Sequence, residues 1–117
     1  MVTLRRCLAH PLTCGLSIDS PETTELRREI IRGNRFLQQI YREWCDAISK
    51  RVPDGPAKIL ELGSGGGILT DYIPDAITSE VFPCRGIRMV ADGRSLPLAS
   101  SSLRAIVLLD VLHHIPE

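Results

Sequence analysis

The chain has 117 residues, a length that corresponds to one domain. Apolar residues make up 44% of it and charged residues 24%, which is ordinary for a soluble globular protein. The formal net charge is zero, so charge gives no reason to expect a nucleic acid or an anionic membrane as partner. No apolar run approaches the length of a membrane span, and no apolar core follows the basic amino terminus as in a secretory signal.

Residues 1–19 contain Pro11 and Gly15 and show no regular periodicity, so we expect an irregular leader there. The four cysteines are Cys7, Cys14, Cys45 and Cys84. None of them forms a Cys-x-x-Cys pair, and no fourth ligand is spaced to join Cys7, His10 and Cys14 in a zinc site. We therefore expect reduced cysteines in a cytoplasmic protein and no bound metal.

A helical cap is predicted over residues 20–52. Ser20, followed by Pro21, has the pattern of a helix start, and Gly33-Asn34 is expected to divide the segment into two helices. Apolar residues then recur at steps of three and four, at Leu26, Ile30, Phe36 or Leu37, Ile40, Tyr41, Trp44 and Ile48. The opposite face is rich in arginine and glutamate. We interpret that face as solvated, the alternative being a basic docking surface.

After the turn cluster at 52–56, short apolar runs alternate with turn residues. The predicted strands are 57–62, 76–81, 87–91 and 103–109, with a short helix over 66–73. Alternating strands and connections favour a parallel, doubly wound α/β sheet. We expect a Rossmann-like sheet of about four strands, with the edge of the fourth strand either unpaired or covered by another segment.

The glycine-rich stretch after the first strand is the strongest local signal. Gly63, Gly65 and Gly67 allow positive φ angles and the close approach of a ligand at the carboxyl edge of the sheet. Ile68 replaces the third glycine of a dinucleotide fingerprint, and no Gly-Lys-Ser/Thr follows as in a phosphate-binding loop. Glu61 would repel phosphates and attract an amine or a sulfonium.

Three segments carry a family resemblance: ILELGSGGG at 59–67, VADGRSLPL at 90–98 and IVLLDVLHHIPE at 106–117. Their order and spacing resemble class I S-adenosylmethionine-dependent methyltransferases that act on small molecules. The resemblance covers 58–117, so we expect 57–117 to be the cofactor-binding half of such a domain, in a truncated form. It implies methyl transfer from S-adenosyl-L-methionine to a small-molecule acceptor, by direct displacement of the sulfonium methyl.

The resemblance also implies a cofactor site. Its residues are Glu61, Gly63, Ser64, Gly65, Gly67, Glu80, Asp92, Gly93 and Asp110. Glu61 matches the acid that helps to hold the amino group, Glu80 the acid that accepts the ribose hydroxyls, and Asp92 the acid that accepts the adenine amino group. Asp110 would lie beside the methionine part. No residue is assigned as the catalytic base.

Each acid has a structural alternative. Glu61 and Glu80 would then face solvent, Asp92 would form a turn with Gly93, and Asp110 would cap a helix. Two other functions stay open as well. One is an NAD-binding oxidoreductase on a similar fold, and the other is a non-catalytic remnant that associates through the exposed edge of the fourth strand.

Overall fold

The computed structural model describes residues 12, 15–17, 20–112 and 115. Its elements in chain order are the helices α2 (Pro21–Gly33) and α3 (Arg35–Ser49), the strand β1 (Lys58–Leu62), the short 3-10 helix η2 (Leu69–Asp71), and the strands β2 (Ile77–Glu80), β3 (Met89–Val90) and β4 (Leu103–Leu108). The predicted leader lies mostly outside the described residues.

The four strands form one parallel sheet in the order β3-β2-β1-β4. In the register of its two central pairs, Leu62 lies opposite Ser79 of β2 and opposite Leu108 of β4. The central strand β1 is buried from Ile59 to Leu62, as expected for a parallel strand that is covered on both faces. The prediction of an open, parallel α/β sheet is confirmed, and the arrangement is consistent with an incomplete Rossmann-like fold.

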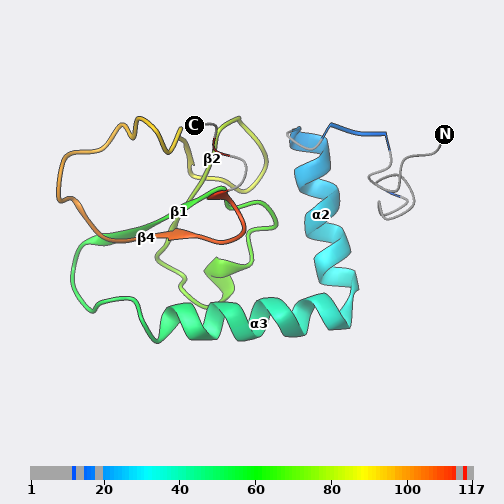
Figure 1. Ribbon diagram of the computed structural model, residues 1–117, viewed down its shortest axis with the longest axis horizontal. Helices are drawn as coiled ribbons and strands as arrows, with labels where there is room; N and C mark the ends of the chain where they lie inside the picture. The colour runs from blue at the N-terminus through cyan, green and yellow to red at the C-terminus, as the bar shows by residue number, and fades with distance from the viewer. Residues whose placement is uncertain (1–11, 13–14, 18–19, 113–114, 116–117) are drawn as a thin grey trace.

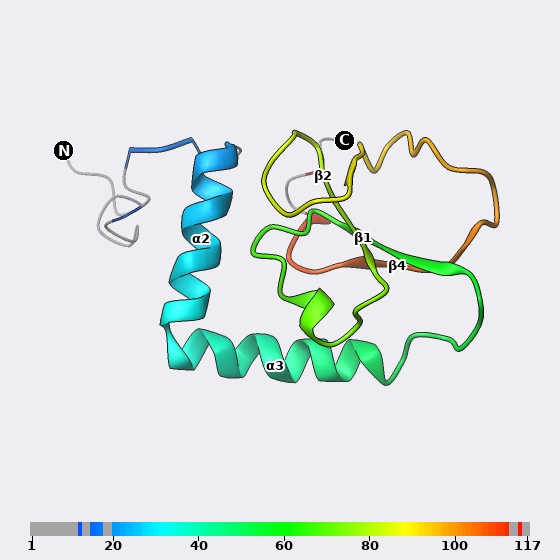
Figure 2. The same cartoon turned by 180° about the vertical axis from the view of Figure 1, so that it is seen from behind.

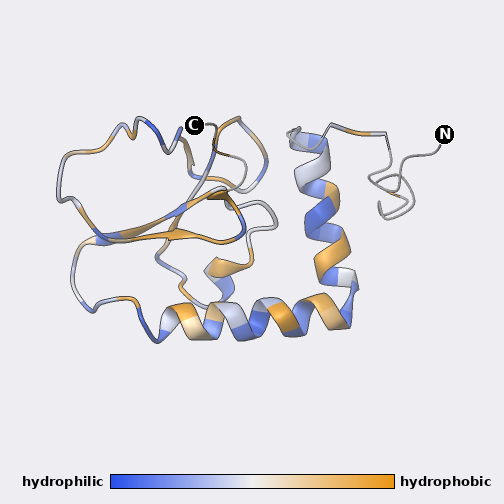
Figure 3. Cartoon of the chain, in the orientation of Figure 1, coloured by the Kyte–Doolittle hydropathy of each residue, from blue (hydrophilic) through white to orange (hydrophobic). Residues whose placement is uncertain are grey.

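Alternation along the strands divides the core into two clusters, one on each face of the sheet. On one face, α3 and η2 pack against the sheet, and the buried members are Cys45, Ile59, Leu69, Ile73, Ala76 and Val107. Figures 1 and 2 show α3 running along this face, and Figure 3 shows apolar residues recurring between polar ones along it. On the other face Leu60, Leu62 and Ala91 pack with Leu96 and Leu98 of the irregular segment before β4.

The two helices begin where the sequence predicts. The Ser20 side chain accepts a hydrogen bond from the backbone N–H of Thr23, at 3.2 Å, and Pro21 opens α2. The Asn34 side chain accepts hydrogen bonds from the N–H groups of Phe36 and Leu37, at 3.0 and 3.1 Å. Asn34 thus both ends α2 and caps α3, so the change of direction between the helices is encoded locally.

Two of the predicted elements, a helix and a strand, are much shorter in the structure. The helix expected over 66–73 is a single 3-10 turn at Leu69–Asp71, because Gly65, Gly66 and Gly67 precede it and Pro74 follows it. The third strand, expected over 87–91, is reduced to Met89–Val90. In the described part of the chain, no helix is both long enough and apolar enough to cross a bilayer.

Candidate functional site

The turn after β1 takes the unusual backbone shape that its glycines allow. Gly63, Gly65 and Gly67 have φ angles of +64°, +48° and +64°. A Cβ atom on Gly63 would lie 2.6 Å from Cγ2 of Val111, and one on Gly67 would lie 3.4 Å from a guanidinium nitrogen of Arg28. Among the described residues, the one atom within 4 Å of a Cβ atom on Gly65 would be the backbone oxygen of Gly63, at 3.8 Å. Gly65 is therefore the position in this turn with room for a ligand, since protein atoms already fill the space beside the other two.

Ser64 has a structural role inside the turn. Its backbone N–H donates to the carbonyl of Ser79, and its hydroxyl accepts the N–H of Ser79, both at 2.9 Å. The Ser79 hydroxyl in turn donates to the carbonyl of Glu61 at 2.7 Å. These bonds extend the β1–β2 pairing into the turn. The Ser64 side chain is thus part of the scaffold, and the turn is held rigidly against β2.

Glu61 is the most unusual polar residue of the structure. It lies within β1 with only 3% of its surface exposed, which rules out the solvent-facing alternative. Its Oε2 atom has no hydrogen-bond partner among the described residues. Burial raises the pKa of Glu61 to about 7; a hydrogen bond from Ser64 opposes the shift, and the charge of Glu80 adds to it. A buried carboxylate oxygen without a donor is costly, and a cationic group beside it would relieve that cost.

Glu80 ends β2 next to the glycine turn. It is 8% exposed, so this acid also is not a surface residue. Its Oε1 atom accepts the backbone N–H of Gly65 at 2.8 Å, which fixes the carboxylate against the turn. β3 is the neighbour of β2 in the sheet, and the N–H of Ala91, just after β3, donates to the carbonyl of Glu80 at 2.9 Å. The next residue is Asp92, so these two acids come from the adjacent carboxyl ends of neighbouring strands.

Asp92 takes part in a tight local turn. Its Oδ1 atom accepts the N–H of Arg94 at 2.9 Å, and its two carboxylate oxygens receive the Arg94 guanidinium, the shortest distance being 2.6 Å. These contacts lower the pKa of Asp92 to about 2. The turn-forming alternative is therefore correct. A ligand that binds this carboxylate would have to share it with Arg94, whose guanidinium is exposed. Gly93 lies beside it, facing Leu62.

Asp110 follows β4, which lies on the other side of β1 from β2 and β3, and it has a positive φ angle of 59°. Burial raises the pKa of Tyr41, and the charges of Asp110 and Glu61 raise it further. Tyr41, which the sequence assigned mainly to packing, is half-buried. It lies close enough to both acids for their charges to affect its pKa. It also stacks edge-on against Trp44, with ring centroids 5.5 Å apart. Tyr41 therefore belongs with the residues around the turn.

The structure gathers the predicted acids at one edge of the sheet, where the carboxyl ends of parallel strands meet. Arg28 is the residue that the sequence did not reveal. It was assigned to a solvated helix face, but its Nε atom donates to the carbonyl of Gly66 at 3.1 Å. The contact spans 38 residues, and no local pattern predicts it.

The segment LHHIPE is described only in part, because 113–114 and 116–117 lie outside the described residues. The possible zinc ligands Cys7, His10 and Cys14 lie outside them as well. Among the residues that the structure does describe, no group of histidine, cysteine and acidic side chains could hold a metal ion. Comparisons of the chain with models of protein families, with curated proteins and with solved structures found no match.

Proposed function

We propose that this chain is the S-adenosylmethionine-binding part of a methyltransferase that acts on a small-molecule acceptor. The observation that carries the proposal is the buried Oε2 atom of Glu61, two residues before the glycine turn, which has no hydrogen-bond partner in the part of the chain that the structure describes. A ligand with an ammonium group would supply that donor. The segments that resemble the methyltransferase motifs add the identity of the ligand.

The residues present fit such a ligand. Glu61 would hold the ammonium group, and the open face of Gly65 would admit the methionine part. Glu80 would accept the two ribose hydroxyls, because a carboxylate offers two charged acceptor oxygens. Asp92 would accept the adenine amino group in exchange for part of its contact with Arg94. Gly63 and Ser64 would shape the turn from within, and Asp110 would border the methionine part.

S-adenosylmethionine supplies a methyl group on a sulfonium, which a substrate O, N or C atom displaces in line while the neutral thioether leaves. Because the leaving group is neutral, the protein has no strong anion to stabilise, and its main contributions are positioning and the exclusion of water. We assign no catalytic base. Burial raises the pKa of Tyr41, which keeps its hydroxyl protonated at neutral pH.

The test is calorimetric titration of the folded chain with S-adenosylmethionine, S-adenosylhomocysteine and NAD. We expect 1:1 binding of the first two ligands, and we expect Asp92→Ala to weaken it about tenfold or more, as loss of a hydrogen bond to a charged group does. Asp54→Ala is the matched control, because Asp54 is an exposed acid in the loop before β1.

Absence of heat with both adenosyl ligands, on a chain shown to be folded by circular dichroism, would refute the proposal. Stabilisation by NAD alone would favour the oxidoreductase alternative. A folded chain that associates but binds none of the three ligands would favour the non-catalytic alternative.

A further inference from the structure

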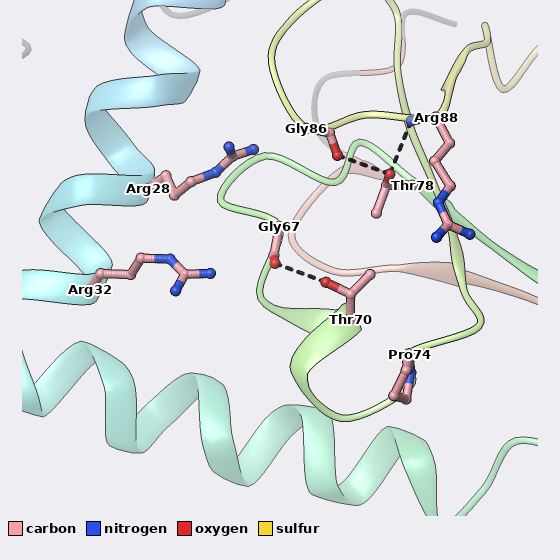
Figure 4. A pocket seen from close by; sticks show the side chains of 8 residues that line it. All are labelled: Arg28, Arg32, Gly67, Thr70, Pro74, Thr78, Gly86 and Arg88. Carbon is pink, nitrogen blue, oxygen red and sulfur yellow. Dashed lines mark hydrogen bonds between the residues drawn. The ribbon is translucent and has the colours of Figure 1, made fainter.

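A second concavity lies between α2 and the segments that flank β2. It has a volume of about 260 Å³ and is lined by Arg28, Arg32, Gly67, Thr70, Pro74, Thr78, Gly86 and Arg88. Figure 4 shows Arg28 and Arg32 projecting into it from α2, and Arg88 projecting from the other side. Of the residues predicted for the cofactor, only Gly67 lines this pocket.

The pocket concentrates positive charge that the protein itself does not neutralise. In the described part of the chain, the one carboxylate within ion-pair distance of these three guanidiniums is Asp71, whose Oδ2 atom lies 3.8 Å from Arg32. Both side chains of that pair are 56% exposed, so the pair is weak. Three guanidiniums and one carboxylate leave a net charge of two positives around the cavity. Arginine stays protonated in proteins, so the mutual repulsion of these guanidiniums cannot be relieved by loss of a proton.

The arginines also keep donors to spare. Arg28 uses Nε for the carbonyl of Gly66 and Nη2 for the carbonyl of Arg85, at 3.1 and 3.0 Å, and these bonds hold the guanidinium in place without cancelling its charge. Among the described residues, no acceptor is bonded to its Nη1 atom or to the guanidinium of Arg88. By contrast, the hydroxyls of Thr70 and Thr78 donate to carbonyls of the surrounding loops. Recognition in this pocket therefore depends on guanidinium groups.

We propose that this pocket binds a phosphate group, either as the free ion or as a monoester of a small molecule. A phosphate monoester carries about one and a half to two negative charges near neutral pH. This matches the two positive charges that the pocket leaves uncompensated. Its oxygens match the fork of a guanidinium, which is why arginine is so common at phosphate sites. Arg28 links the pocket to the carbonyl of Gly66, so a bound phosphate would also stiffen the glycine turn.

The test is calorimetric titration with inorganic phosphate and with glycerol 3-phosphate, at constant ionic strength set with sodium chloride. We expect saturable 1:1 binding that weakens as salt is raised. We expect Arg88→Gln to weaken it about tenfold or more, since a hydrogen bond to a charged group is lost. Arg88 is exposed and its side chain makes no hydrogen bond to the described part of the chain, so the variant should fold. Tighter binding of the monoester than of the free ion would identify a phosphorylated small molecule as ligand, and the reverse would identify phosphate itself.

Arg42→Gln is the matched control, because Arg42 is an exposed arginine of α3 that does not line the pocket. Its affinity for phosphate should equal that of the native chain. The proposal would be overturned by the absence of saturable binding, by equal losses in the two variants, or by competition between phosphate and S-adenosylhomocysteine. Because phosphate binding is measured without the adenosyl ligand, its failure is distinguishable from failure of the proposed function.

Discussion

At the scale of single residues, the chemistry of the site depends on where one carboxyl group is buried. Glu61 follows two apolar residues in β1, and alternation along the strand turns it toward the face covered by α3. Cys45 of that helix lies nearby; burial raises the pKa of its thiol to about 11, and the charge of Glu61 adds to the shift. Both groups are therefore protonated over most of the range below neutral pH.

The raised pKa of Glu61 predicts a pH-dependent stability. Its pKa is about 7 in the folded protein against an ordinary value of 4.5, so between these values the folded state binds more protons than the unfolded state. Stability should be greatest below the unfolded pKa and should fall by up to about 3 kcal/mol as the pH rises through the folded pKa. Urea unfolding of the native chain and of Glu61→Gln at several pH values across this window measures the effect.

The Gln variant carries no ionisable group at this position, so most of that decline should disappear from its curve. If both proteins lost the same free energy of unfolding over the window, another group would be responsible for it.

At the scale of elements, the turn between β1 and η2 connects the sheet to α2. Arg28 and Ile31 of α2 contact it from one side, since a Cβ atom on Gly66 would lie 3.1 Å from Cδ1 of Ile31. Val111 contacts it from the end of β4. The turn is therefore packed on two sides, and its glycines are required for contact with the protein as well as for any ligand.

Gly63→Ala tests that packing. The new methyl group would collide with Val111 and would force alanine to a φ angle of +64°. We expect a loss of about 2 kcal/mol or more in the free energy of unfolding. Gly33→Ala is the control, because Gly33 ends α2 with open space around it, and it should be neutral or stabilising by about 0.5 kcal/mol. Equal values for the two variants in guanidinium unfolding would show that the turn tolerates a side chain.

At the scale of the whole molecule, β4 forms one edge of the sheet beside an open groove. The groove has a volume of about 780 Å³ and lies between α3 and β4. Its lining includes Trp44 and Ile106, which are 46% and 45% exposed. Among the described residues, β4 pairs only with β1, and an edge strand with apolar neighbours is a template for pairing with another chain, which is the basis for predicting association through this edge.

Ile106→Lys should weaken that association, since a charge on an edge strand opposes pairing. Sedimentation velocity over a range of concentrations should show the native chain associating and the variant remaining mostly monomeric. Val81→Lys is the control, because Val81 is equally apolar and 61% exposed but follows the interior strand β2. A native chain that stays monomeric at every concentration would contradict the prediction.

Local sequence determined the elements of this protein and the order in which they occur. Ser20 and Asn34 set the starts of the helices, short apolar runs set the strands, and glycines set the turn, because each of these preferences acts within a few residues. The same patterns located the acids at strand ends. They did not give the length of the segment at 66–73, where a helix was expected and only the turn η2 forms.

Only the tertiary structure decided how those residues are used. It left the Oε2 atom of Glu61 buried without a partner among the described residues, placed Val111 against Gly63, paired Asp92 with Arg94, and brought Arg28 to the glycine turn. Apart from the Asp92–Arg94 pair, these features join segments far apart in the chain, or depend on how completely distant segments exclude water. Such contacts form only when the sheet and both helices pack together, so they cannot be predicted from a pattern of a few neighbouring residues.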